Sequence, residues 1–283
     1  MPERYNQSMK KVRLDLLLVE RGLAESRTKA QALIMAGQVR VDEQVELKAS
    51  SAVSPDARLD LETGPRFVSR GGEKLEAALA TFPVDVTGRV CADVGSSTGG
   101  FTDCLLQHGA AKVYAIDVGK GLLHWKLRSD ARLVIMEETN ARHVEKLPEL
   151  VSLVTVDAAF ISLKILLPVV RGWFGPPSGP SQFTNMGGEM KQGGGGIIAL
   201  IKPQFEAGRK ETARNRGVIR DPEVHQAVLT DVLTFAQGQG FGIRGLIRSP
   251  LQGPKGNVEF LAWLGTREAD QTELAALVQR ALG

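Results

Sequence analysis

Apolar and polar residues follow one another along the chain in blocks that predict a mainly α/β protein. From residue 90 onward, short apolar runs alternate with longer stretches in which apolar residues recur at helical spacing. The runs predict strands at 90–94, 113–117, 132–136, 151–156, 196–201, 241–247 and 259–264. Helices are expected between them, for example at 101–108 and 222–237. This alternation favours a parallel, doubly wound sheet of the Rossmann-like kind.

The last two predicted strands differ from the others because no helix separates them. The intervening stretch contains Pro250, Gly253, Pro254 and Gly256, which predict a loop. Two strands joined in this way are expected to form an antiparallel hairpin. Such a hairpin is typical of a methyltransferase-type sheet rather than of a nicotinamide-binding one.

The first sixty residues have a different pattern and predict a separate small α+β domain. One helix is expected at Arg13–Arg21, with Gly22 as its C-cap, and a second is expected from the N-cap Ser26 until it stops at Gly37. Alternating residues then predict short strands at 39–41, 45–47 and 59–61. The predicted organisation is a flexible extension (1–11), an N-terminal domain (12–63), a linker (64–72) and a body (73–283) with a flexible glycine-rich insertion (172–196).

Composition restricts the class of protein without naming a function. The chain has 283 residues, of which 43% are hydrophobic, and it contains no apolar run of about 18 residues and no apolar leader. Its two cysteines offer no disulfide framework, and its four scattered histidines offer no metal-like pair, so we expect a cytoplasmic protein without a metal. The net charge is +3, yet residues 1–41 alone hold eight basic and four acidic residues. A basic N-terminal end on a near-neutral body indicates a polyanionic partner.

A glycine-rich turn after the first body strand is the predicted cofactor site. Asp93 ends the strand, and a second strand ends in Asp117. The first carboxylate would repel a pyrophosphate but suits a cationic ligand, and the second is placed to bind ribose hydroxyls. A ligand that has both groups is S-adenosylmethionine. The candidate cofactor-binding residues are Asp93, Gly95, Ser96, Ser97, Thr98, Gly99, Gly100, Phe101, Asp117, Val118 and Asn140.

Polar residues also stand at the ends of three later strands. Asp157 and Lys202 follow parallel strands, and Glu259 begins the antiparallel one. All three are therefore expected at the same edge of the sheet, beside the glycine-rich turn. Lys74 lies in the first turn of a helix that starts near residue 73, where a cation opposes the helix dipole.

The N-terminal domain resembles the S-four-type RNA-binding domain. The matching residues are Arg13-Leu14-Asp15, the stretch from Ser26 through Ala30, and Ile34, Gly37, Val39 and Val41. The resemblance implies docking on structured RNA through shape and phosphates. Candidate RNA-binding residues are Arg13, Arg27, Lys29, Arg40 and Arg70.

The body resembles the FtsJ-type ribose 2′-O-methyltransferases, and more closely the TlyA family of hemolysins and ribosomal RNA cytidine 2′-O-methyltransferases. The motifs that carry this include Ser69-Arg70-Gly71-Gly72-Glu73-Lys74-Leu75, Phe160-Ile161-Ser162-Leu163, Gly217-Val218-Ile219-Arg220-Asp221-Pro222 and Gly256-Asn257-Val258-Glu259-Phe260. Lys74, Asp157, Lys202 and Glu259 match the catalytic Lys-Asp-Lys-Glu tetrad of these enzymes. The resemblance implies that Lys202 is the base that accepts the ribose proton.

The expected function is therefore S-adenosylmethionine-dependent methylation of a ribose 2′-hydroxyl in ribosomal RNA, at a cytidine. The expected partners are ribosomal RNA or ribosomal subunits, with no membrane partner, and the protein is expected to be a monomer. One alternative is a non-catalytic RNA-binding assembly factor that keeps a cofactor pocket, although the intact tetrad argues against it. A second alternative is a membrane-lysing hemolysin, which the absence of an apolar leader or span disfavours.

Overall fold

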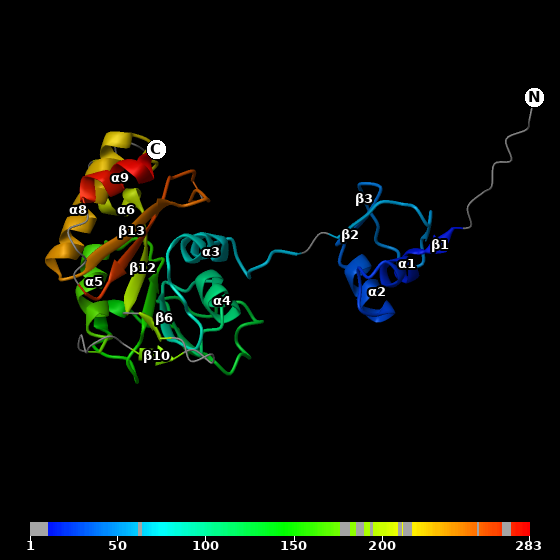
Figure 1. The fold of residues 1–283 in the computed structure, drawn as a ribbon, viewed down its shortest axis with the longest axis horizontal. Coiled ribbons are helices and arrows are strands. Elements are labelled where there is room, and N and C mark those ends of the chain that lie inside the picture. Colours follow the sequence, from blue (N-terminus) through cyan, green and yellow to red (C-terminus); the bar gives the residue numbers. More distant parts are fainter. Residues whose placement is uncertain are drawn as a thin grey trace, which may run out of the picture. The chain divides into compact units, whose positions relative to one another are not determined.

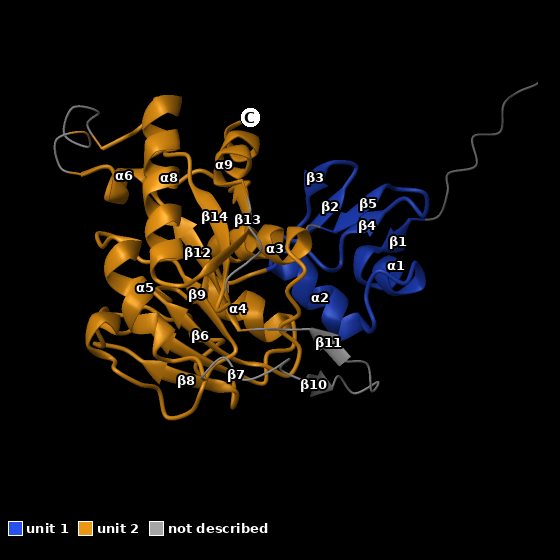
Figure 2. Ribbon diagram, turned by 60° about the vertical axis from the view of Figure 1, so that its left-hand side comes forward, with its two compact units in different colours: residues 1–66 blue, residues 67–283 orange. Residues whose placement is uncertain are grey.

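The computed structural model describes residues 11–61, 64–175, 182–184, 190–192, 195–208, 211, 217–253, 255–267 and 273–283. The chain forms two compact units, Met1–Arg66 and Phe67–Gly283. They are drawn in blue and orange in Figure 2. Among the described residues, no helix is long and apolar enough to cross a membrane.

The first unit packs two helices against short strands around one small core. Its elements are β1 (Val12–Arg13), α1 (Leu14–Glu20), α2 (Arg27–Met35), β2 (Val39–Val41), β3 (Gln44–Val45), β4 (Ala52–Val53) and β5 (Leu59–Leu61). The Ser26 hydroxyl caps α2 by accepting a hydrogen bond from the Lys29 amide, as the sequence predicts. Leu14, Leu18 and Ile34 are fully buried and hold α1 and α2 together.

The second unit is built on a twisted sheet (Figure 1). The sheet has seven strands in the order β13-β14-β12-β9-β6-β7-β8. The strands are β6 (Val90–Val94), β7 (Lys112–Ile116), β8 (Leu133–Met136), β9 (Leu153–Val156), β12 (Gly196–Ile201), β13 (Gly242–Arg248) and β14 (Phe260–Gly265). Strand β14 pairs antiparallel with both β12 and β13, which confirms the predicted hairpin. The other pairings are parallel, so β6, β7, β9 and β12 end at one edge of the sheet.

Helices cover both faces of this sheet. The helical elements are α3 (Gly71–Thr81), α4 (Gly100–Gln107), η1 (Ala141–His143), α5 (Leu163–Arg171), α6 (Pro203–Glu206), α8 (Pro222–Gly238) and α9 (Leu274–Leu282). One core lies between the sheet and α3 and α4, and a larger core lies between the sheet and α5, α8 and α9. The unit is therefore a three-layer α/β/α domain, as the alternation of strands and helices predicts.

Two parts of the sequence-based picture need correction. Strands β1 and β4 pair with each other and were not predicted, because two residues are too few to show an alternation. The predicted insertion 172–196 is too wide at its start. Trp173 lies at the end of α5 with 1% of its surface exposed, and its indole N–H donates to the carbonyl of Val144. A two-stranded ladder of β10 (Gln182–Thr184) and β11 (Met190–Gln192) lies further along. The rest of that stretch and the extension 1–10 lie outside the described residues.

Candidate active site

Two lysine–carboxylate pairs, one buried and one partly buried, meet at the carboxyl edge of the sheet. Lys74 Nζ on α3 lies 2.5 Å from Glu259 Oε2, just before β14, and Glu259 is 1% exposed. The two residues are 185 positions apart in the chain. Their contact depends on the antiparallel course of β14, which brings the start of that strand to the edge where its neighbours end.

The second pair joins the ends of β9 and β12. Lys202 Nζ lies 2.5 Å from Asp157 Oδ1. It also donates to the backbone oxygen of Ala158 at 3.2 Å and to that of Asp157 at 3.5 Å. Three acceptors around one nitrogen match the three N–H bonds of an ammonium group. Lys202 Nζ is thus held in place by oxygen acceptors from both Asp157 and Ala158.

All four members of the predicted tetrad line one cavity of about 340 Å³. Its walls come from the glycine-rich turn, the start of α3 and the loop that joins β13 to β14. The other lining residues are Ser69, Arg70, Gly71, Gly95, Ser96, Ser97, Thr98, Gly100, Phe101, Ala159, Leu251 and Gln252. The tetrad is therefore brought together in one place, as expected from strand ends that share an edge.

The glycine-rich turn is shaped by close backbone approaches that a side chain would block. Gly95 has φ +80°, and a Cβ there would lie 2.7 Å from the backbone oxygen of Asp157. At Gly100 a Cβ would lie 2.3 Å from the Ser69 hydroxyl. Ser97 also adopts a left-handed φ of 49°, and its amide donates to Asp117 Oδ2 at 2.8 Å. These contacts fix the loop against the strand ends that carry the tetrad.

Asp93 does not line the tetrad cavity. It is fully buried and accepts hydrogen bonds from the hydroxyls of Thr102, at 2.7 Å, and Thr155, at 2.8 Å. Burial raises the pKa of Asp93 to about 6, and the two hydroxyl donors oppose that rise. The structure therefore places Asp93, predicted to hold the cationic end of the ligand, among buried side chains and outside the cavity lining. Its position is that of a brace between β6, β9 and α4.

A second cavity of about 540 Å³ adjoins the first and contains most of the predicted ribose and adenine contacts. Asp117, Val118 and Asn140 line it, together with Ile116, Leu122 and other apolar residues. Asp117 accepts hydrogen bonds from Ser97 N and from Gly119 N, the latter at 2.7 Å. Asn140 caps η1 through its side-chain oxygen. The two cavities share Gly95, Ser97, Asp157 and Ala159, so one elongated ligand can span both.

Phe160 is a lining residue to which the sequence pattern assigned no role. Its ring is 90% exposed, its backbone is left-handed with φ 62°, and it contacts the ring of Phe205 at 5.0 Å between centroids. A left-handed non-glycine residue is strained, and such strain is concentrated at functional sites. Glu206 on α6 accepts hydrogen bonds from the Ser162 hydroxyl and the Leu163 amide, which ties this segment to the end of β12. The signal in the sequence was an aromatic residue three positions after a strand-end acid.

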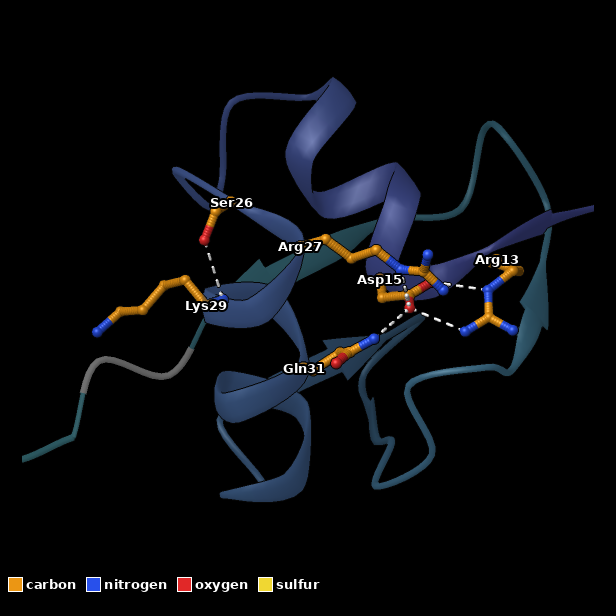
Figure 3. Close-up of polar contacts among 6 residues, drawn as sticks. All are labelled: Arg13, Asp15, Ser26, Arg27, Lys29 and Gln31. Carbon is orange, nitrogen blue, oxygen red and sulfur yellow. Dashed lines mark hydrogen bonds and ion pairs between the residues drawn. The ribbon is translucent and has the colours of Figure 1, made fainter.

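In the first unit, a buried carboxylate organises the predicted RNA-binding arginines (Figure 3). Asp15 is fully buried and accepts hydrogen bonds from Arg13 Nη2 at 2.8 Å, Arg27 Nε at 3.0 Å and Gln31 Nε2 at 3.0 Å. The hydrogen bond from Arg13 is the main cause that lowers the pKa of Asp15 far below its usual range. About half of each arginine side chain remains exposed, 41% of Arg13 and 54% of Arg27. The pair is thus held in place while its outer N–H groups face solvent.

The remaining predicted RNA contacts are not gathered in the same way. Lys29 points away from Asp15 at the start of α2 (Figure 3), and Arg40 donates to the backbone oxygen of Glu43 at 3.0 Å. Arg70 belongs to the second unit and lines the smaller cavity.

Outside the cavities, the described residues include a group of potential metal ligands that the sequence pattern did not indicate. Cys104 and His108 are four positions apart at α4, and their ligand atoms lie with that of Glu76 within 4.8 Å of one another. His108 Nε2 and Glu76 Oε2 are already paired at 2.7 Å. The i, i+4 spacing was the available signal, but an ion pair accounts for the contact.

The sheet order, the glycine-rich turn at the end of β6 and the acid at the end of β7 together define a Rossmann-type methyltransferase fold. A sequence model of the FtsJ-like methyltransferase family matches residues 67–266, and one of the S4 domain matches residues 12–59. The chain belongs to the FtsJ-like methyltransferases, in the TlyA/hemolysin branch that carries an N-terminal S4 domain.

Relatives of known name cover nearly the whole chain. YqxC of Bacillus subtilis (strain 168), provisionally named an rRNA methyltransferase, is 44% identical over 96% of this chain and 94% of its own. The 16S/23S rRNA (cytidine-2′-O)-methyltransferase TlyA of Mycobacterium tuberculosis (strain ATCC 25618 / H37Rv) is 42% identical over 91% of each chain. A solved structure from Streptococcus thermophilus, provisionally named a hemolysin, superposes with a TM-score of 0.68 at 38% identity, over 97% of this chain and 95% of that one.

Proposed function

We propose that this protein is an S-adenosylmethionine-dependent methyltransferase that modifies a ribose 2′-hydroxyl of ribosomal RNA, at a cytidine. The observation that carries the proposal is the cavity lined by two lysine–carboxylate pairs, Lys74–Glu259 and Lys202–Asp157. Family membership supports the same chemistry, and the relative from Mycobacterium tuberculosis is named for cytidine 2′-O-methylation.

The larger cavity fits the cofactor in size and chemistry. Pockets for such ligands are mainly apolar and hold a few fixed polar groups. In the proposal, Asp117 accepts the ribose hydroxyls, Val118 and Asn140 lie against the adenine, and the turn around Gly95 accommodates the methionine end. The absence of a Cβ at Gly95 leaves room for close approach to the strand ends. When bound, S-adenosylmethionine supplies an electrophilic methyl group on a sulfonium.

The tetrad then has two duties. A ribose hydroxyl is a poor nucleophile until its proton is removed, and we assign proton acceptance to Lys202. A free lysine is mostly protonated at neutral pH, so this residue must first lose a proton to solvent, and its ion-pair partner Asp157 orients it in the cavity. Lys74 and Glu259 form the opposite wall and position the hydroxyl.

We assign recognition of the RNA to both units. The Asp15-anchored arginines of the first unit present N–H groups suited to phosphate, and an S-four-type domain is suited to structured RNA. In the second unit, the exposed ring of Phe160 at the rim of the cavity is suited to stack on the base of the target nucleotide. The proposal places the protein in the cytoplasm with the ribosomes, acting as a monomer.

The test uses S-adenosylmethionine labelled in its methyl group. The protein is incubated separately with unmethylated small and large ribosomal subunits, and the label is mapped to a nucleotide. We expect ribose label at a cytidine with the native protein and none with Lys202→Ala. Lys112→Ala is the matched control, because Lys112 is also ion-paired but lies at the start of β7, at the opposite edge of the sheet.

Other outcomes would contradict the proposal in distinct ways. No label in either subunit, with cofactor binding confirmed by calorimetry, would favour the non-catalytic assembly factor. Full methylation activity of Lys202→Ala would contradict the assignment of Lys202 as the base. Leakage of dye from liposomes at the concentrations used for methylation would support the hemolysin name that the Streptococcus thermophilus structure carries.

A further inference from the structure

A short segment after β7 displays apolar side chains to solvent. Val118 is 69% exposed, Leu122 is 48% exposed and Trp125 is 72% exposed. Exposure of a tryptophan is costly because its ring buries more apolar area than almost any other side chain. Three large apolar residues exposed within eight positions form a patch rather than a scattered occurrence.

The segment is anchored on both sides of the exposed tryptophan. Leu123 and Leu127 are buried in the core under α3 and α4, with 4% and 6% of their surfaces exposed. The amide of His124 donates to the backbone oxygen of Thr98, at 3.1 Å, and Thr98 lines the tetrad cavity. The exposed ring is therefore held outward by fixed neighbours and is tied directly to the cofactor loop.

A lysine and a histidine lie beside the ring. Lys126 Nζ lies 5.9 Å from the centroid of the Trp125 ring, and the ring of His124 lies against it at 5.7 Å. Within the part of the chain that the structure describes, Lys126 forms no ion pair. Val118 and Leu122 continue the patch into the larger cavity, which they line. The patch thus joins an aromatic face and an available positive charge to the mouth of the site.

We propose that Trp125, with Leu122 and Lys126, is a docking surface for an unpaired stretch of the RNA substrate. The indole stacks on a base, and Lys126 pairs with a neighbouring phosphate. Proteins that bind single-stranded nucleic acid combine these two contacts. This inference rests on the proposed function in taking RNA as the substrate. The charge beside the ring favours a polyanion over an apolar protein partner. The proposed docking surface adds an RNA contact on the catalytic unit that is separate from the arginines of the first unit.

Tryptophan emission gives a direct readout. Trp173 is 1% exposed and Trp263 is half-buried, so Trp125 dominates the response to quenchers. The full-length Lys202→Ala protein, saturated with S-adenosylhomocysteine, is titrated with a short oligocytidylate RNA and, separately, with double-stranded RNA. We expect the oligocytidylate to change the emission and to protect Trp125 from acrylamide, and we expect Trp125→Phe to remove the acrylamide-sensitive component.

Affinity measurements complete the test. Trp125→Ala is expected to weaken binding of oligocytidylate about tenfold, which corresponds to about 1.4 kcal/mol. Trp125→Phe should retain most of the native affinity for oligocytidylate. Lys126→Ala should lower the salt dependence of that affinity by about one phosphate contact. Leu150→Ala is the control, because Leu150 is also an apolar residue with most of its surface exposed, 61%, and it precedes β9 at the other edge of the sheet. Cofactor affinity should be unchanged in all variants.

The outcomes separate this inference from the proposed function. Methyl transfer to ribosomal RNA with no RNA effect on Trp125 and native affinity in Trp125→Ala would overturn the docking surface alone. An RNA-dependent change at Trp125 without methyl transfer by the native protein would overturn the proposed function alone. Self-association that is lost in Trp125→Ala would show that the patch binds a second copy of the chain, and would also overturn the inference.

Discussion

Removal of one partner from the Lys74–Glu259 pair should destabilise the catalytic unit strongly. The two charged atoms are 2.5 Å apart, and the side chains are 11% and 1% exposed, so removal of Lys74 leaves a buried carboxylate at Glu259 without its charge partner. An uncompensated buried charge costs about 3–5 kcal/mol, which is a large part of a typical domain's stability. We therefore predict that Lys74→Met lowers the free energy of unfolding of the second unit by about 3–5 kcal/mol.

A double-mutant cycle tests the reasoning. Glu259→Gln should cost only about 1–3 kcal/mol, because the amide can still accept a hydrogen bond from Lys74. The double variant Lys74→Met/Glu259→Gln should recover much of the lost stability, since no buried charge is left unpaired. The resulting coupling free energy should be at least about 2 kcal/mol. The double variant should nevertheless fail to methylate RNA, which separates stability from chemistry.

Urea unfolding followed by tryptophan fluorescence is the appropriate assay. The three tryptophans, Trp125, Trp173 and Trp263, all belong to the second unit, so the signal is specific to it. The matched control is the Lys112–Glu149 pair, in which each side chain is 40% exposed. Exposed pairs couple by about 0–1 kcal/mol. If the buried pair couples no more strongly than this control, the argument from burial is refuted.

Three further predictions concern residues that support the sites. Gly95→Ala should abolish cofactor binding measured by calorimetry, because the added Cβ would lie 2.7 Å from the Asp157 carbonyl; retained affinity would mean that the turn is pliable. The hydrogen bond from Arg13 lowers the pKa of Asp15 in the folded protein. The ionised Asp15 therefore stabilises the fold at pH values above its unfolded-state pKa of about 3.9, and this stabilisation is lost as the pH falls below that value. The Asp15→Asn variant should weaken RNA binding by the full protein and should lack this acid-dependent loss in a pH series of melting curves. For Asp93, burial raises the folded pKa to about 6, so its stabilising contribution is present below pH 4 and is lost as the pH rises through 6. The stability of Asp93→Asn relative to the native protein should therefore increase between pH 4 and pH 7, and a flat difference would contradict the assignment.

The strand ends that carry the tetrad could be predicted from the sequence because their signals are local. An apolar run that stops at a polar residue marks a strand end, and parallel strands bring their ends to one edge. Asp157 and Lys202 follow directly from this rule. Glu259 follows once the hairpin of β13 and β14 is recognised from the proline and glycine residues between them.

The pairings inside the site could not be predicted because they depend on neighbours in space. The sequence does not say that Lys74 meets Glu259 while Lys202 meets Asp157, since this requires the order of β14, β12 and β9 in the sheet. Nor does it say which way Asp93 points. A residue near the end of a strand can face the ligand or the helix behind the strand. Here the hydroxyls of Thr102 and Thr155 donate hydrogen bonds to the Asp93 carboxylate.

The same limit applies in the first unit. The basic residues near the N-terminus indicated a polyanion partner, but only the fold shows that a buried Asp15 clamps Arg13 and Arg27 while Lys29 and Arg40 stand elsewhere. No functional role was predicted for Trp125, for a related reason. An isolated tryptophan between leucines has the pattern of a core residue, and only its 72% exposure distinguishes it.

The position of β14 also determines the order in which the two units can complete their folding during synthesis. This strand comes after β13 along the chain, yet it lies between β12 and β13 in the sheet. A chain still being synthesised, and extended only through Arg248, therefore lacks the strand that closes the sheet and the glutamate that pairs with Lys74. The small first unit, whose contacts are local, can fold while the remainder is being made. The nascent protein thus gains its RNA-docking domain well before its catalytic cavity is complete, and its chemistry remains off until translation has passed β14.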